Sequence, residues 1–186
     1  MWGLVEDNVI TKIINQPKGM VIGDTRHSRK IFELWSEAEL NNVGLYSVVF
    51  DNTNKKDEAY YTNTDVSYNF AAGAVTASYG SPTAKALADV TDEEGRVTPG
   101  LKSQKKSIIK QQASGLLTPT DWQVIKATEV ESYSVPSAIT TYRANVRTKS
   151  NDMETLIDAC GTVDELAALY VPVDGTRPLG EFPEAV

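Results

Sequence analysis

Cysteine and histidine are nearly absent from this sequence. The 186 residues include one cysteine, Cys160, and one histidine, His27. A single cysteine cannot close an intrachain disulfide, and a zinc site built on His and Cys needs about four ligands. We therefore expect no disulfide framework, no such metal site and no cofactor.

Long apolar runs are also missing. No stretch approaches the roughly 20 apolar residues that a membrane-spanning helix requires. The first residues, MWGLVEDNVITKII, contain Glu6 and Asp7 and have no continuous apolar segment, so neither a signal peptide nor a transit peptide is expected there. The sequence favours a soluble chain that is made in a cytoplasm and has no membrane partner.

Basic residues are too few for a general nucleic-acid binder, since the formal net charge is −7 and the pI is about 4.8. The charge is unevenly distributed. Residues 101–150 carry 8 basic and 3 acidic residues, whereas residues 151–186 carry 1 and 8. Either basic helices neutralise acidic neighbours in the same fold, or the basic segment forms a docking face for an acidic partner.

Recognisable catalytic motifs are absent as well. The sequence has no GxGxxG, P-loop or GxSxG motif, and a single histidine rules out HExxH. His27 lies among Arg26, Arg29 and Lys30, which would disfavour the imidazolium that a serine-type triad must stabilise. The sequence therefore predicts a protein that is not an enzyme, with no catalytic residue.

The first part of the chain has the patterns of strands. WGLVEDNVITKII predicts two strands around a turn, and VSYNFAAGAVTASYG predicts a hairpin around Ala71-Ala72-Gly73. Ser36 and Glu39 have the spacing of a capping box, and Gly44 suits the end of that short helix. Residues 1–90 are thus expected to form a small α+β unit with β-hairpins.

The pattern changes to helical after a charged, Gly- and Pro-containing stretch. We interpret residues 91–100 as a linker, 101–170 as a helical bundle and 171–186 as an extended arm, because that last segment has three prolines and two glycines. The predicted fold class is α+β, with a small N-terminal β-rich unit, a C-terminal helical bundle and an extended C-terminal arm.

The stretch LLTPTDWQVIKATE, residues 116–129, predicts a well-defined helix start. Thr118 is placed to cap it and Pro119 suits its first turn. We expect Trp122 to insert between the helices that contain Ile109 and Tyr142. Arg143 and Arg147, four residues apart, are then expected to reach Glu129 or Glu131 and hold the bundle in register.

The longer stretch LLTPTDWQVIKATEVESYSVPSAITTYRANVR resembles the C-terminal helical module of many bacteriophage tail proteins, including tail-fibre assembly chaperones. The start of the chain, with Trp2 and IFELWSEAELNNVGLYSVV, and the hairpin VSYNFAAGAVTASYG are similar to the opening and middle of such proteins. The residues that carry the similarity of the helical module are Leu116, Leu117, Thr120, Asp121, Trp122, Lys126, Glu129, Pro136, Tyr142, Arg143, Val146 and Arg147.

The resemblance implies a structural part of a phage tail, such as a tail-fibre base, an adaptor or a baseplate-peripheral subunit. Such a protein would be made in the host bacterial cytoplasm, reside in the virion tail, form an oligomer there and bind other tail, fibre or baseplate proteins. In the arm, Leu179 and Phe182 are candidates to dock in a groove of a neighbour.

Two other functions remain open. One is a tail-fibre assembly chaperone that is not retained in the virion. Chaperones of this kind often end with Trp-Pro-x-x-Pro after the Tyr-Arg helix, whereas here the helix continues through METLIDACGTVDELAALY. The other is a tail-attached hydrolase, which would need a carboxylate whose loss abolishes activity.

Overall fold

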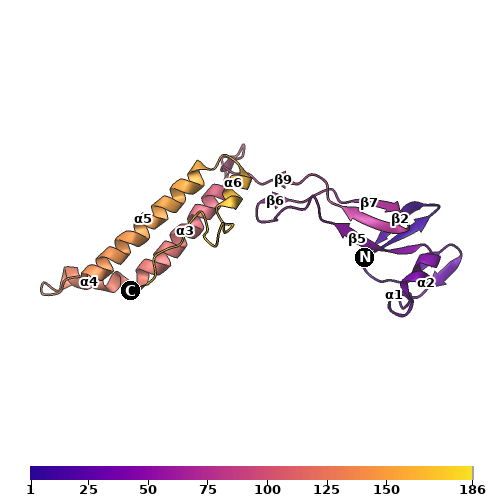
Figure 1. Cartoon of the computed structure of the whole chain (residues 1–186), viewed down its shortest axis with the longest axis horizontal. Helices are drawn as coiled ribbons and strands as arrows, with labels where there is room; N and C mark the ends of the chain where they lie inside the picture. Colours follow the sequence, from indigo (N-terminus) through magenta and orange to yellow (C-terminus); the bar gives the residue numbers. More distant parts are fainter. Residues whose placement is uncertain (186) are drawn as a thin grey trace. The chain divides into compact units, whose positions relative to one another are not determined.

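A computed structural model describes residues 1–185, which divide into a first compact unit, Met1–Thr83, and a second that begins at Ala84 (Figure 1). Strands dominate the first unit and helices the second, so the predicted α+β class is confirmed. The first unit contains β1 (Trp2–Glu6), β2 (Val9–Ile14), β3 (Met20–Ile22), β4 (Thr25–His27), α1 (Ile31–Leu34), α2 (Glu37–Asn42), β5 (Leu45–Asp51), β6 (Tyr61–Thr62), β7 (Ser67–Ala71), β8 (Ala74–Ser78) and the start of β9 (Thr83–Ala84). The second contains β10 (Val90–Thr91), β11 (Val97–Thr98), α3 (Leu101–Leu117), the 3₁₀ helix η1 (Thr118–Thr120), α4 (Asp121–Glu129), α5 (Ser137–Ala159) and α6 (Val163–Ala168).

A five-stranded sheet with the order β2-β1-β5-β8-β7 organises the first unit. Both predicted hairpins are present, β1 with β2 and β7 with β8. Asp7 and Asn8 have φ values of 50° and 63°, and Ala72 and Gly73 have values of 52° and 76°. These positive φ values match the two-residue turns whose twist suits a hairpin. The hairpins are joined through β5, which pairs antiparallel with β1 and parallel with β8.

The short helices of the first unit close one end of its core. Ser36 and Glu39 form the predicted capping box around the start of α2. The chain leaves α2 through Gly44 at φ 82°, where a Cβ would lie 2.5 Å from the carbonyl oxygen of Val5. The core cluster beneath consists of Leu4, Ile14, Met20, Ile31, Leu40 and Leu45.

Helices α3 and α5 lie side by side and form the body of the second unit (Figure 1). Lys106 and Lys110 of α3 pair with Asp158 and Glu154 of α5 at 2.7 and 3.3 Å, which shows that the two helices run antiparallel. These pairs support the interpretation that the basic segment neutralises acidic neighbours in the same fold. Beyond them, Thr162 and Glu165 form a second capping box at the start of α6.

The break between the units lies earlier than the sequence predicted. Residues 91–100 were expected to be a linker, but β10 and β11 pair as a hairpin there. The amides of Leu101 and Lys102 donate to the carbonyls of Ala86 and Leu87 at 2.9 and 3.1 Å. Because the first amides of a helix have no partner within it, residues 86 and 87 complete the start of α3 and belong to the helical unit.

No helix in the described part of the chain is long and apolar enough to cross a membrane.

Candidate interaction surface of the helical unit

The corner between α3 and α4 is built by the sequence Thr118-Pro119-Thr120. Pro119 has no N–H to donate to the preceding turn, so the regular α-helix gives way to η1. Thr118 does not cap a helix as predicted. It is itself helical, and its hydroxyl donates to the carbonyl of Ser114 at 2.8 Å. Thr120, whose side chain accepts no capping bond, occupies the position before α4.

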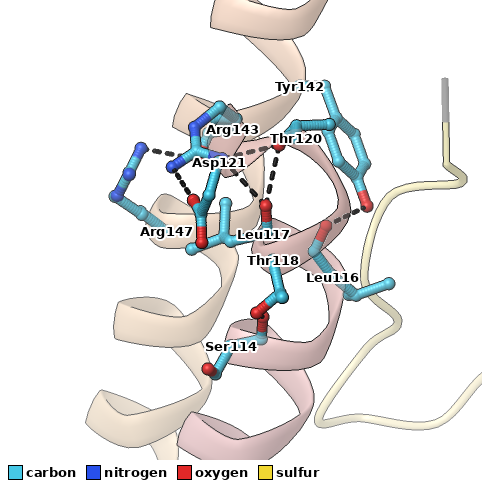
Figure 2. A network of polar contacts seen from close by, with 9 residues as sticks. All are labelled: Ser114, Leu116, Leu117, Thr118, Thr120, Asp121, Tyr142, Arg143 and Arg147. Carbon is cyan, nitrogen blue, oxygen red and sulfur yellow. Dashed lines mark hydrogen bonds and ion pairs between the residues drawn. The ribbon is translucent and has the colours of Figure 1, made fainter. Parts of the chain in front are cut away.

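Side chains of α5 satisfy the carbonyl end of α3 (Figure 2). The Arg143 guanidinium donates to the Leu117 carbonyl at 2.8 Å and to the Thr120 hydroxyl at 2.5 Å. The Tyr142 hydroxyl lies 3.4 Å from the Leu116 carbonyl and donates to it. The last carbonyls of a helix lack partners and carry partial negative charge, so a cation is favoured there.

Arg143 also forms the ion pair that fixes the direction of α4. Its other terminal nitrogen lies 2.7 Å from Asp121, and its side chain is only 10% exposed. The predicted partners, Glu129 and Glu131, are therefore wrong for this arginine. The same pairing predicted for Arg147 is also wrong. Its side chain is exposed and donates to the Arg143 carbonyl at 3.4 Å.

The predicted burial of Trp122 is also wrong, since this residue is 56% exposed. Successive residues of a helix point about 100° apart, so turning Asp121 toward Arg143 directs Trp122 away from α3 and α5. The Lys126 ammonium lies 6.0 Å from the centroid of the Trp122 ring and 4.5 Å from that of the Tyr133 ring. Trp122 thus belongs to the surface of the unit.

Helix α4 consequently exposes Trp122 and Ile125 on one face, about 60° apart around the helix, whereas Val124 lies about 160° from Trp122. None of its nine residues is buried. Its side-chain contacts to the rest of the unit include the Asp121–Arg143 ion pair and Gln123, which accepts from the Tyr133 hydroxyl at 3.2 Å. Lys126 adds a contact with the Tyr133 ring. The large apolar residues exposed on and just after the helix are Trp122 (56%), Val124 (40%), Ile125 (54%) and Val130 (39%). Clustered exposed apolar residues mark protein interaction sites more often than isolated ones do.

The C-terminal segment is folded onto its own helices and is not an extended arm over residues 171–185, while Val186 lies outside the described residues. Val173 and Thr176 pair across a tight turn at Asp174 and Gly175. The Leu179 amide donates to the Leu169 carbonyl at 3.0 Å.

The two predicted docking residues therefore contact their own chain. Leu179 is only 4% exposed. Phe182 packs against the cluster of Ala113, Tyr142 and Val146. Leu179 is a core residue here and is not available to a neighbour.

A groove runs between α3 and the end of the chain. Its volume is about 540 Å³, and α3 contributes Ile108, Gln112, Gly115 and Leu116 to its lining. Phe182–Ala185 lines the opposite side. Sequence reasoning missed this groove, although the turn-forming Asp174-Gly175 and Gly180 indicated that the segment could reverse direction.

Other reactive groups lie apart from these surfaces. Burial raises the pKa of the Cys160 thiol, which donates to the Leu156 carbonyl at 3.4 Å. His27 packs edge-on against Trp35 with 5.4 Å between ring centroids. Within residues 1–185, no group of three or more His, Cys, Asp or Glu side chains is arranged to hold a metal ion.

Comparisons with protein-family models, curated proteins and solved structures each found no match.

Proposed function

We propose that this chain is a non-enzymatic structural component of a bacteriophage tail, a tail-fibre base, adaptor or baseplate-peripheral subunit that acts by docking to neighbouring tail proteins. The resemblance of residues 116–147 to the helical module of tail proteins supports the tail assignment. The exposed apolar face of α4 supports the docking role, and it is the observation on which the proposal chiefly rests.

The argument from α4 is energetic. Trp122 and Ile125 share one face of the helix and are 56% and 54% exposed, although full burial of such a side chain is favourable by roughly 1.5–3 kcal/mol. The helix is instead held by the Arg143–Asp121 pair and by its continuity with η1. A helix that is held in place by polar contacts and presents its apolar residues outward is suited to binding another protein. The surface is apolar and aromatic, so we assign it to a protein neighbour.

Mass spectrometry of purified particles tests the assignment. A tail component is expected at a defined copy number relative to the major capsid protein, in multiples of three or six because tails follow those symmetries. Absence from particles, together with recovery from infected lysate in complex with a fibre protein, would instead identify a tail-fibre assembly chaperone.

An assay of the purified protein tests the non-enzymatic part of the proposal. Purified protein is expected to release no product from host cell-wall or surface polysaccharide. Release that disappears when one carboxylate is replaced by its amide would contradict a purely structural role.

A further inference from the structure

The β3–β4 hairpin and the residues beside it form a basic region in an otherwise acidic unit. Residues 18–30 contain four basic residues and one acidic residue, whereas the rest of Met1–Thr83 contains three basic and nine acidic residues. All four basic residues are exposed. We call them the basic patch, which consists of Lys18, Arg26, Arg29 and Lys30.

The fold of the hairpin brings the two ends of this sequence segment together. A Cβ on Gly19 would lie only 3.4 Å from the carbonyl oxygen of His27, so the chain before β3 runs beside the chain after β4. Lys18 therefore lies beside the residues that follow β4. Residues 26–30 span at most roughly 14 Å, so one short segment of a partner can reach the whole patch.

The basic patch is less neutralised than the basic residues of the helical unit. Lys106 and Lys110 of α3 pair with carboxylates of α5. Within residues 1–185, only Arg29 of the patch forms an ion pair, and its contact with Glu33 at 3.5 Å joins two exposed side chains. An exposed pair of this kind is weak, so most of the positive charge of the patch remains available to a partner.

Two exposed apolar side chains adjoin the basic patch. Val21 lies opposite Arg26 in the antiparallel register and is 61% exposed. Leu34 is 75% exposed, and its amide donates to the Lys30 carbonyl at 2.9 Å, which places these two residues one helical turn apart. Each apolar residue is thus the neighbour of a basic one.

We propose that the basic patch, together with Val21 and Leu34, binds an acidic segment of another protein in which carboxylates and apolar side chains are interspersed. The carboxylates complement the charge of the patch, and the apolar side chains cover the two exposed apolar residues. This inference concerns the first unit alone, so it depends neither on the tail assignment nor on the face of α4.

Two other classes of partner fit the same surface less well. Single-stranded nucleic acid binds by stacking its bases on aromatic rings, but Phe32 and Trp35, which follow the patch, pack against the core cluster of the unit. An anionic membrane repels a chain with a net charge of −7, and two apolar side chains offer little area for insertion.

A peptide of defined sequence tests the binding directly. The probe is a fluorescein-labelled twelve-residue peptide that repeats Glu-Glu-Val-Val, because each face of this peptide carries both carboxylates and valines when it is extended. Fluorescence anisotropy at about 50 mM NaCl should give a Kd below roughly 1 mM, and about 500 mM NaCl should weaken binding about tenfold. No binding up to that protein concentration would overturn the proposal.

Charge reversal locates the site. Lys18→Glu together with Arg26→Glu should weaken binding of the peptide about tenfold. The matched control is Lys126→Glu together with Arg147→Glu, which changes the net charge equally at exposed positions of the helical unit and should weaken binding less than about twofold. Equal weakening by the two double variants would mean that only net charge matters and would overturn the proposal.

A separate measurement shows that the hairpin of the variant is intact. Near-ultraviolet circular dichroism reports the packing of Trp35 against His27, whose ring centroids are 5.4 Å apart. This signal should match that of the wild type. If it does not, Lys18→Gln together with Arg26→Gln replaces the reversed pair, and its binding should still be weaker than that of the control.

The apolar part of the site has its own test. A peptide that repeats Glu-Glu-Ser-Ser should bind more weakly than the valine peptide, and Val21→Ser should reduce the difference between the two peptides. Equal affinity of the wild type for both peptides would contradict the role of Val21. Tighter binding to a DNA duplex, or to phosphatidylcholine vesicles with about 30% phosphatidylserine, would assign the patch to a different class of partner and overturn the proposal.

Discussion

Replacing the buried Arg143 by alanine should destabilise the helical unit more than replacing any exposed charged residue near the corner of α3 and α4. The guanidinium makes hydrogen bonds to the Leu117 carbonyl, the Thr120 hydroxyl and Asp121 at 2.8, 2.5 and 2.7 Å. Its side chain is 10% exposed, so water cannot replace these bonds without a rearrangement.

The magnitude follows from the separate contacts. Asp121 is 49% exposed, so its ion pair contributes at most about 1 kcal/mol. Hydrogen bonds from a charged donor contribute about 1.5–3 kcal/mol, but Thr120 also donates to the Leu117 carbonyl and partly satisfies it. We therefore expect Arg143→Ala to lower the free energy of unfolding by about 3 kcal/mol. In a unit of this size that lowers Tm by roughly 12–24 °C.

Arg147→Ala is the matched control, because Arg147 lies one turn later on α5 and is exposed. It should change the free energy of unfolding by less than about 0.5 kcal/mol. Urea unfolding followed by circular dichroism at the helical minimum measures both variants. Arg143→Lys should fall between them, since an ammonium keeps the charge but cannot bond in the same fork. Equal destabilisation by Arg143→Ala and Arg147→Ala would refute the role assigned to the guanidinium.

Four further substitutions test other parts of the structure. Trp122→Ala should change the free energy of unfolding by less than about 0.5 kcal/mol, and a loss of about 3 kcal/mol in the same urea experiment would mean that the side chain is buried after all. Gly115→Ala should stabilise the chain by about 0.5–1 kcal/mol, because its Cβ meets open space within α3. Gly44→Ala should destabilise it by about 2–4 kcal/mol, because Gly44 has a φ of 82° and the new Cβ would lie 2.5 Å from the Val5 carbonyl oxygen. Thermal melts that show the same sign for both substitutions would contradict this reasoning. Hydrogen bonds from Ser103 and the Gly100 amide lower the pKa of Asp89, so its contribution is present above the unfolded pKa of about 3.9 and lost as the pH falls through the lower folded value. The Tm difference between the wild type and Asp89→Asn should accordingly shrink between pH 7 and pH 3, and a constant difference would exclude this carboxylate as the source.

Local patterns predicted much of the fold. The capping boxes at Ser36 and Thr162 depend on residues three positions apart, and both are present. The turns at Asp7-Asn8 and Ala72-Gly73 depend on two adjacent residues, and both hairpins form. The parallel pairing of β5 with β8 could not be predicted in this way, because it joins segments separated by two other strands and depends on the packing of the whole unit.

The errors at the interaction surface share a physical origin. Large apolar side chains are usually buried, which predicted a packed Trp122, but one polar neighbour decided the rotation of its helix. Arg143 had several acidic residues within reach, and the choice of Asp121 follows from the bend at Thr118–Thr120. Residues 86 and 87 were predicted to belong to the N-terminal unit, yet their carbonyls complete the start of α3. Each outcome depends on contacts between residues that are distant in sequence.

Incorporation of an α4 variant into particles tests the docking role most directly. A phage whose gene encodes Trp122→Ser together with Ile125→Ser is compared with one that encodes Val90→Ser and Val97→Ser, a pair of similar exposure on the β10–β11 hairpin. Quantitative mass spectrometry of purified particles, normalised to the soluble amount in the lysate, should show at least a tenfold loss for the α4 pair and near-normal incorporation for the hairpin pair. Normal incorporation of a folded α4 variant would contradict the claim that this face binds a neighbouring tail protein.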